Sequence, residues 1–225
     1  MRMGTLYIVS TPIGNLKDIT LRAIEVLKKV DYVLCEDTRV TGKLLKAYEI
    51  DKRMESFNEF TEDRKTGQVI LDLKKGSKIA LVSDAGTPLV SDPGFKLVRE
   101  AGNQGIKVES IPGATAAIAA LSVSGLPPDK FLFVGYLPKK EGKRKEILKK
   151  VKAIKESLPS TVIFYESPFR VLKLLGEIKE VLGDVDVVIC RELTKLHEEV
   201  RREKISQTSL HFSQSTPRGE FVVLI

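Results

Sequence analysis

The sequence predicts an α/β protein with two α/β domains, the first on a mostly parallel sheet and the second on a mixed sheet. Strand-like and helix-like segments alternate along almost all of the 225 residues, a pattern typical of parallel sheets covered by helices. Turn residues at Pro112-Gly113 and again from Gly125 to Pro128 interrupt this alternation near the middle. We therefore expect an N-terminal domain over residues 1–112 and a C-terminal domain over residues 113–225.

In the first half, buried apolar runs predict strands, and apolar residues at helical spacing predict helices. The expected strands cover residues 5–11, 31–36, 78–83 and 107–111, and the expected helices cover residues 21–30, 41–48, 63–74 and 94–104.

The second half also alternates strand-like and helix-like segments. Fewer of its connections are clear crossovers between parallel strands, which favours a mixed sheet. A helix of small residues is expected over 114–124, with further helices over 143–156 and 169–182. Strands are expected over 131–137, 161–165, 185–190 and 220–225, and residues 198–206 fit a polar strand or an irregular segment.

Residues 83–94 are the most informative stretch of the chain. Asp84, Gly86 and a turn-rich segment follow the expected strand 78–83, and Asp92-Pro93 then supplies residues suited to starting a helix. An acid, an approachable backbone and a helix N-terminus thus lie at the carboxyl end of a buried strand, where open α/β sheets bind ligands. An ordinary βα loop with turn residues fits the local pattern equally well.

Polar groups follow other expected strands too. Glu36, Asp37 and Arg39 follow the second strand, where they can orient a polar substrate or cap the next helix through an ion pair. Glu166 and Lys195 lie after two strands of the second half. The segment from Ser10 to Leu16 resembles a phosphate loop in position, but it fits neither the Walker pattern nor G-x-G-x-x-G.

The composition excludes several classes of protein. No apolar run approaches the roughly 20 residues of a membrane-spanning helix, and the start has no signal-peptide pattern, so we expect a cytoplasmic protein. Cys35 and Cys190 lie in separate apolar runs and are expected to be buried free thiols. His197 and His211 have no ligand partners at metal-binding spacing, and we expect no metal.

The net charge of +7 is local. Residues 139–155 contain nine basic and two acidic residues, which accounts for the whole excess. A basic patch on a balanced protein favours a polyanionic partner, and a solvated helix face is the alternative. We expect RNA contacts from Lys139, Lys140, Lys143, Arg144, Lys145 and Lys149.

Taken in order, the motifs resemble a known family. They are Ser-Thr-Pro-Ile-Gly-Asn-Leu (10–16), Glu-Asp-Thr-Arg (36–39), Ser-Asp-Ala-Gly-Thr-Pro (83–88), Ser-Asp-Pro-Gly (91–94), Pro-Gly-Ala-Thr-Ala (112–116), Ser-Gly-Leu (124–126), Gly-Tyr-Leu-Pro (135–138), Tyr-Glu-Ser-Pro-Phe-Arg (165–170), Glu-Leu-Thr-Lys (192–195) and Arg-Gly-Glu-Phe-Val (218–222). The set resembles the small-subunit ribosomal RNA cytidine 2′-O-methyltransferase branch of the tetrapyrrole methylase superfamily, the class III methyltransferases.

The resemblance implies a homodimer that holds S-adenosylmethionine in the cleft between its domains. It also implies methylation of the 2′-hydroxyl of a cytidine in the decoding region of 16S ribosomal RNA. The implied cofactor contacts are Pro12, Ser83, Asp84, Ala85, Gly86, Thr87, Pro112, Gly113, Ala114, Thr115, Leu137 and Tyr165. We assign the acceptor side of the reaction to Glu36, Asp37, Arg39, Glu166 and Lys195.

Two other functions remain open from the sequence. A methyltransferase of the same superfamily could act on a tetrapyrrole, with the lysines merely solvated, or a non-catalytic module could bind the ribosome. Longer family members continue past the 218–222 motif into a further small region. If this chain lacks that region, RNA binding is expected from residues 139–155 or from a partner subunit.

Overall fold

The computed structural model describes residues 3–225, which form two compact units. The first unit ends at Thr115 and the second spans Ala116–Ile225. The sequence prediction placed this division three residues earlier, after residue 112.

The first unit contains a five-stranded sheet with the order β3-β2-β4-β1-β5, and every neighbouring pair is parallel. The interior strands β2 and β4 are almost wholly buried, as expected for a sheet covered on both faces. The strands are β1 (Thr5–Val9), β2 (Tyr32–Cys35), β3 (Arg53–Ser56), β4 (Lys78–Leu81) and β5 (Lys107–Ile111).

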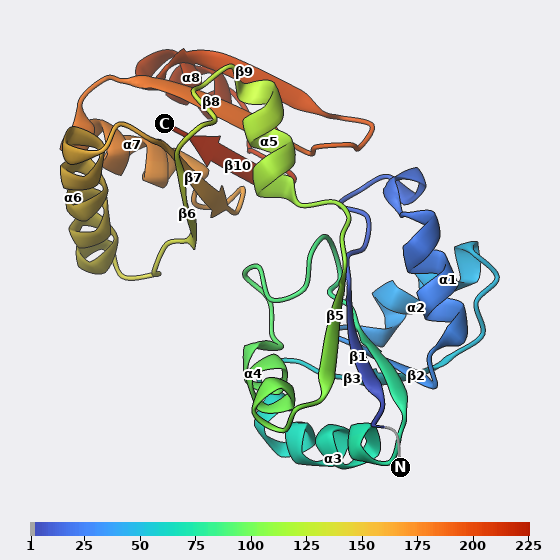
Figure 1. The fold of residues 1–225 in the computed structure, drawn as a ribbon. Helices are drawn as coiled ribbons and strands as arrows, with labels where there is room; N and C mark the ends of the chain where they lie inside the picture. The colour runs from blue at the N-terminus through green and yellow to red at the C-terminus, as the bar shows by residue number, and fades with distance from the viewer. Residues whose placement is uncertain (1–2) are drawn as a thin grey trace. The chain divides into compact units, whose positions relative to one another are not determined.

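Helices cover the two faces of this sheet in pairs (Figure 1). One face carries α1 (Leu21–Lys29) and α2 (Thr38–Ala47), which follow the short 3-10 helix η1 (Leu16–Asp18). The other face carries α3 (Glu62–Lys74) and α4 (Phe95–Asn103). The connection after β4 therefore goes to the opposite face from those after its neighbours β1 and β2. This reversal opens the edge of the sheet at the carboxyl end of β4.

The second unit has the strand order β6-β7-β10-β8-β9. Only β6 and β7 pair in parallel, and the other pairs are antiparallel, so the sheet is mixed as predicted. Its strands are β6 (Phe131–Tyr136), β7 (Thr161–Glu166), β8 (Asp186–Arg191), β9 (Glu199–Lys204) and β10 (Phe221–Leu224).

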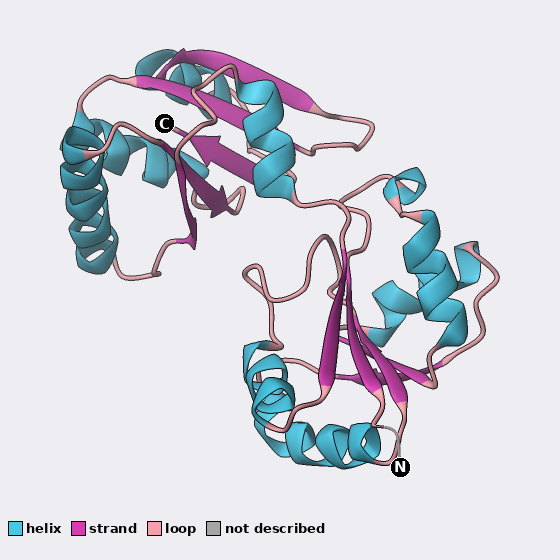
Figure 2. Cartoon of the chain, viewed as in Figure 1, coloured by secondary structure: helices cyan, strands magenta, loops and turns pink. Residues whose placement is uncertain are grey.

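The main core of the second unit lies between this sheet and three helices, α6 (Glu141–Ser157), α7 (Val171–Leu182) and α8 (Ile205–Ser213). The fourth helix, α5 (Ala116–Ser124), packs against β7, β8, β9 and β10. Successive side chains of β8 point to opposite faces: Ile189 lies in the main core, whereas the Cys190 thiol approaches the Ala120 carbonyl of α5. Figure 2 shows the division into helices, strands and loops.

The structure differs from the expected elements at three places. The expectation missed β3, and residues 198–206 resolve into β9 followed by the start of α8, a helix that was not expected. Helix α4 begins at Phe95 with Gly94 as its N-cap, so Asp92-Pro93 lies just before the helix instead of starting it. Within residues 3–225 no helix combines the length and apolar character needed to cross a membrane. Both cysteines are buried free thiols, as predicted.

Candidate active site

Three loops of the first unit, those after β1, β4 and β5, are joined at the carboxyl edge of its sheet. Thr11 and Gly86 exchange both main-chain hydrogen bonds, with N···O distances of 2.8 and 3.1 Å. The Thr87 hydroxyl lies 2.9 Å from the Ser10 hydroxyl and 2.6 Å from the Thr115 hydroxyl, and it donates to the Ala114 carbonyl at 3.0 Å. Side chains from three separate loops therefore meet at one threonine.

Two glycines permit this close approach. Gly86 has a φ of 87°, a left-handed conformation that glycine adopts without strain. A Cβ atom added at Gly113 would lie 2.9 Å from the Cβ of Ser10, so any larger residue would push the β5 loop away from the β1 loop. Both glycines are in the predicted cofactor set, and the structure gives each of them a packing reason.

The β4–α4 loop is held at its far end by a buried carboxylate. Glu62 of α3 is 7% exposed, and its Oε1 accepts hydrogen bonds from the main-chain nitrogens of Gly94 and Lys96 at 3.2 and 3.0 Å. It thereby satisfies N–H groups that the first turn of α4 leaves without partners. Between these anchored ends, Leu89 and Ser91 adopt positive φ values of 72° and 68°, and such strain persists only where the surrounding structure enforces it.

Carboxylates gather at the same edge. Burial, followed by the charge of Glu36, raises the pKa of Asp92 to about 6. Burial and the charge of Asp84 also raise the pKa of Glu36, and burial raises that of Asp84. Asp84 accepts a hydrogen bond from the Asp37 main-chain nitrogen at 3.1 Å, which ties the β2 loop to the β4 loop. The edge is therefore electronegative.

Asp37 caps helix α2 and forms an ion pair with Arg39, the role that the sequence offered as the alternative to orienting a substrate. Its Oδ1 accepts from the Arg39 main-chain nitrogen at 2.8 Å and so caps α2. Both carboxylate oxygens also accept from Nε of Arg39, at 3.0 and 3.1 Å. These hydrogen bonds from Arg39 lower the pKa of Asp37 to about 2. Asp37 is thus an ionised cap and ion-pair partner, and no hydrogen bond to the Glu36 carboxylate is present among the described residues.

A pocket of about 380 Å³ lies beside these acids in the first unit. It brings together four sequence-predicted residues, Glu36, Asp37, Arg39 and Asp84. The remaining lining comes from Thr38 and from the end of β3 and the loop that follows, namely Ser56, Asn58, Glu59 and Phe60. Sequence reasoning missed this wall because it missed β3, a strand of only four residues with no fully buried member.

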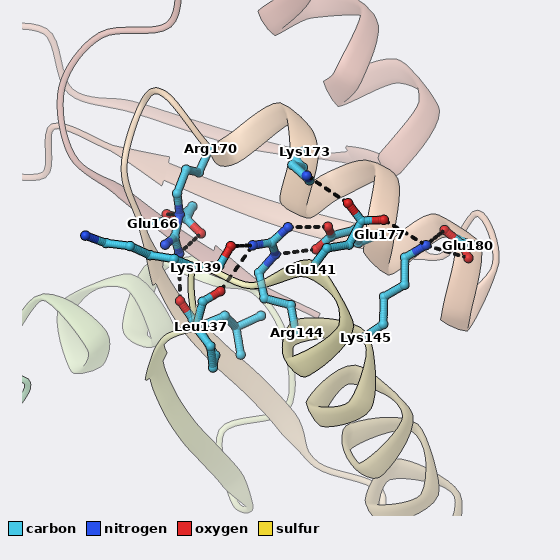
Figure 3. Close-up of polar contacts among 11 residues, drawn as sticks. Leu137, Lys139, Glu141, Arg144, Lys145, Glu166, Arg170, Lys173, Glu177 and Glu180 are labelled. Atoms are coloured by element: carbon cyan, nitrogen blue, oxygen red, sulfur yellow. Dashed lines mark hydrogen bonds and ion pairs between the residues drawn. The ribbon is translucent and has the colours of Figure 1, made fainter.

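In the second unit, Glu166 is almost fully buried, at 2% exposure. Its Oε1 accepts from the Ser167 main chain and from Nε of Arg170, at 2.7 and 2.8 Å, and its Oε2 accepts from Nη2 of Arg170 at 2.7 Å. The same Nη2 donates to the Leu137 carbonyl at 2.9 Å. Figure 3 shows this chain of contacts. Glu166 is therefore positioned to fix Arg170 and the end of β6.

The other predicted residues of the second unit are held in place as well. Lys195 pairs with Glu192 at 2.8 Å and with Glu220 at 2.9 Å. The Tyr165 hydroxyl accepts from the Ala117 main-chain nitrogen at the start of α5, and its ring packs edge-on against Phe133. Leu137 is 2% exposed and its side chain belongs to the hydrophobic core, so its main chain is the part that a ligand could contact.

The basic segment divides into exposed and interior residues. Lys139, Lys140, Lys143 and Lys149 are exposed, whereas the Lys145 ammonium bridges Glu141 and Glu180. Arg144 is 4% exposed and forms a bidentate pair with Glu177, at 2.7 and 2.6 Å. The prediction that Arg144 contacts RNA is therefore corrected, because its guanidinium lies inside the second unit. The sequence indicated this burial, because Arg144, Leu148 and Val151 recur at the spacing of one helix face, and that face is buried.

Among residues 3–225, no group of three or more His, Cys, Asp or Glu side chains is arranged to hold a metal ion.

The predicted cofactor and acceptor-side residues form two sets, one in each unit. Those of the loops after β1, β2, β4 and β5 are in the first unit, and those around Leu137, Tyr165, Glu166 and Lys195 are in the second.

Comparison with known proteins gives a consistent match. Residues 5–208 match the model of the tetrapyrrole (corrin/porphyrin) methylases. A Thermotoga maritima protein named ribosomal RNA small subunit methyltransferase I is 47% identical over 223 residues, which cover 99% of this chain and 98% of that protein. The Escherichia coli O157:H7 protein of the same name is 45% identical, with 99% of this chain and 77% of that protein covered.

Solved structures agree on the fold. A diphthine synthase matches with a TM-score of 0.76 over 99% of this chain and 89% of that chain, at 17% identity. A uroporphyrin-III-C-methyltransferase from Thermus thermophilus matches with a TM-score of 0.65 over 98% of this chain and 94% of that chain, at 21% identity. At these identities the likeness concerns the fold alone.

Proposed function

This chain belongs to the tetrapyrrole (corrin/porphyrin) methylase family, and from that membership we propose that it is an S-adenosylmethionine-dependent methyltransferase acting on small-subunit ribosomal RNA. The observation that carries the substrate is the identity of 47% and 45%, over nearly all of this chain, to proteins named for that activity. The finer proposal is transfer to the 2′-hydroxyl of a cytidine in the decoding region of 16S ribosomal RNA. Such a substrate belongs to the cytoplasm.

The residues at the carboxyl edge of the first sheet fit this cofactor. S-adenosylmethionine supplies an activated methyl group on a cationic sulfonium. The edge carries the carboxylates of Glu36, Asp84 and Asp92, which favour a cation. The Asp84–Thr87 and Pro112–Thr115 loops offer main-chain donors and acceptors at a place where glycines keep the backbone approachable. We assign these two loops, with Pro12 and Ser83, to cofactor binding, together with Leu137 and Tyr165 of the second unit.

The acceptor side is assigned to the pocket beside Asp84. Methyl transfer requires alignment of the attacking oxygen, and Arg39 can hold a ribose or phosphate oxygen at the pocket wall. The 2′-hydroxyl must also lose its proton. Asp37 is committed to Arg39 and to the α2 cap, so we assign proton acceptance to the Glu36 carboxylate, whose raised pKa makes it a better base.

For Glu166 and Lys195 we propose a structural role near the site, not a role in proton transfer. Both are fully engaged with neighbouring charged side chains, so they are proposed to hold neighbouring parts of the second unit in place without taking the proton. RNA contacts are assigned to Lys139, Lys140, Lys143 and Lys149, with Lys145 contributing where it leaves its glutamate partners. Self-association is also part of the proposal, supported by the exposed apolar residues Ile118 and Val123 of α5.

The test is methyl transfer with a defined acceptor. Purified protein is incubated with radiolabelled S-adenosylmethionine and small ribosomal subunits from cells that lack this protein. The RNA is then digested to nucleosides and analysed by mass spectrometry for 2′-O-methylcytidine. Label in that nucleoside supports the proposal. Label in a porphyrinoid offered in parallel, with none in RNA, would move the enzyme to the tetrapyrrole branch. Salt-dependent RNA binding without calorimetric cofactor binding would leave a non-catalytic module.

A further inference from the structure

The loop that joins β6 to α6 (residues 137–140, the β6–α6 loop) connects two parts of the proposed function. It begins at Leu137, a proposed cofactor contact, and ends at Lys139 and Lys140, two proposed RNA contacts. Both lysines are exposed, and neither ammonium has an ion-pair partner among residues 3–225. A loop of four residues that carries both kinds of contact must have a defined main-chain conformation for either contact to be precise.

Two guanidinium groups hold the main chain of this loop. Arg170 donates through Nη2 to the carbonyl of Leu137 at 2.9 Å. Arg144 donates through Nη1 to the carbonyls of Pro138, at 3.1 Å, and Lys139. Three successive peptide carbonyls are therefore bound by two side chains, and Figure 3 shows both guanidinium groups reaching the loop.

Each guanidinium is itself fixed by a buried carboxylate. Glu177 accepts from Nε and Nη2 of Arg144 at 2.7 and 2.6 Å, and both side chains of this pair are 5% exposed. Glu166, with a 1% exposed side chain, holds Arg170 in the same two-pronged manner. A planar guanidinium can bind a carboxylate along one edge and still present N–H groups elsewhere, whereas the compact ammonium of lysine cannot span both sites.

We propose that Arg144 and Arg170 are positioning residues of the methyltransferase, which hold the β6–α6 loop so that Lys139 and Lys140 meet RNA and Leu137 meets the cofactor. The inference rests on the proposed function and adds a division of labour. Arg144 holds the RNA end of the loop, because it binds the carbonyls of residues 138 and 139. Arg170 holds the cofactor end, because it binds the carbonyl of residue 137.

The test is a pair of conservative variants with separate readouts. In Arg144→Lys, the loss of hydrogen bonds to the loop should raise KM for small subunits about 10-fold, which corresponds to about 1.4 kcal/mol and is the size expected for one hydrogen bond from a charged donor. The dissociation constant of S-adenosylmethionine should change less than 2-fold. In Arg170→Lys, the pattern should reverse, with cofactor binding weakened about 10-fold. The matched control is Arg201→Lys, which alters a bidentate pair with Glu203 on β9 and should leave both quantities unchanged.

A merely structural role would be revealed by coupling measurements. If Arg144 acts through the two lysines, Arg144→Lys should have no further effect on KM in a Lys139→Ala, Lys140→Ala background. Equal, additive effects in both backgrounds would overturn the inference, as would loss of thermal stability with unchanged kinetics of the folded enzyme. Where Arg144→Lys does not fold, Glu177→Gln loosens the same guanidinium and takes its place in the comparison. Absence of methyl transfer by the wild-type chain would instead refute the proposed function.

Discussion

The hydroxyl of Thr87 offers the sharpest single-atom test of the candidate site, through the substitution Thr87→Val. A hydroxyl has one proton and two lone pairs. The proton goes to the Ala114 carbonyl at 3.0 Å, so the hydroxyls of Ser10 and Thr115, at 2.9 and 2.6 Å, must both donate to Thr87. All three capacities are used, and the partners belong to two other loops: Ser10 to the loop after β1, and Ala114 and Thr115 to the loop after β5.

Valine keeps the branched shape and removes all three hydrogen bonds. Each bond contributes about 1 kcal/mol net, and Thr87 is half-buried, so water compensates in part. We expect the free energy of unfolding to fall by about 2 kcal/mol in urea titration followed by far-ultraviolet circular dichroism. Because the loops after β1, β4 and β5 lose their common partner, calorimetric affinity for S-adenosylmethionine should fall about 10-fold.

Ser122→Ala is the matched control, because that hydroxyl donates only to the Ala119 carbonyl on the exposed side of α5. It should change the unfolding free energy by less than about 0.5 kcal/mol and leave cofactor affinity unchanged. If Thr87→Val behaves like Ser122→Ala in both measurements, the idea that this hydroxyl joins the three loops is refuted.

Three further substitutions test other parts of the same edge. Burial raises the pKa of Asp92 from 3.8 to about 6, so its stabilising contribution is complete below about pH 4 and is lost as the pH rises through about 6. At pH 7 the free energy of unfolding of Asp92→Asn should therefore exceed that of the wild type by about 1 kcal/mol, a value discounted for partial exposure. At pH 4 the two free energies should be equal. Arg39→Ala should return the pKa of Asp37 from about 2 towards its ordinary range in a carbon-13 NMR titration, because the guanidinium hydrogen bonds are lost; an unmoved titration would contradict this. Gly113→Ala places a Cβ 2.9 Å from a side-chain carbon of the β1 loop and should weaken cofactor binding about 10-fold, whereas Gly176→Ala, whose added Cβ meets nothing within 4 Å, should not.

The sequence predicted the fold well where burial dominates. Strands of the first sheet such as β2 and β4 are short, almost wholly buried apolar runs next to charged residues, which is the composition expected of a strand covered on both faces. The predicted second-half sheet is mixed, as the antiparallel pairing of β10 with β7 and β8 shows. The elements that the sequence did not predict are those without a buried apolar run. β3 has no fully buried residue, and α8 follows β9 directly, with no turn residue between them.

The candidate site was predictable in location and less so in the role of each residue. Its place at the carboxyl edge follows from the alternation of strands and helices. The identity of the helix cap does not, because Glu62 reaches Gly94 from 32 positions away. The same holds for the pocket wall at Asn58 and Phe60. Local sequence patterns report turns and nearby caps, whereas long-range partners depend on how helices pack.

The basic segment shows how chemistry separates residues that charge counting treats alike. Arg144 is the one arginine among the nine basic residues of 139–155. A lysine face in water needs only charge and solubility, which an ammonium supplies, whereas an interior cation must satisfy several fixed acceptors at once. Arg144 meets two carboxylate oxygens of Glu177 and two carbonyls of the β6–α6 loop. An arginine in phase with the apolar stripe of a lysine-rich helix is therefore better interpreted as an interior clamp than as part of the surface that binds the polyanion. The proposed RNA contacts are then the exposed lysines of this segment, of which Lys139 lies in the loop whose carbonyls Arg144 binds.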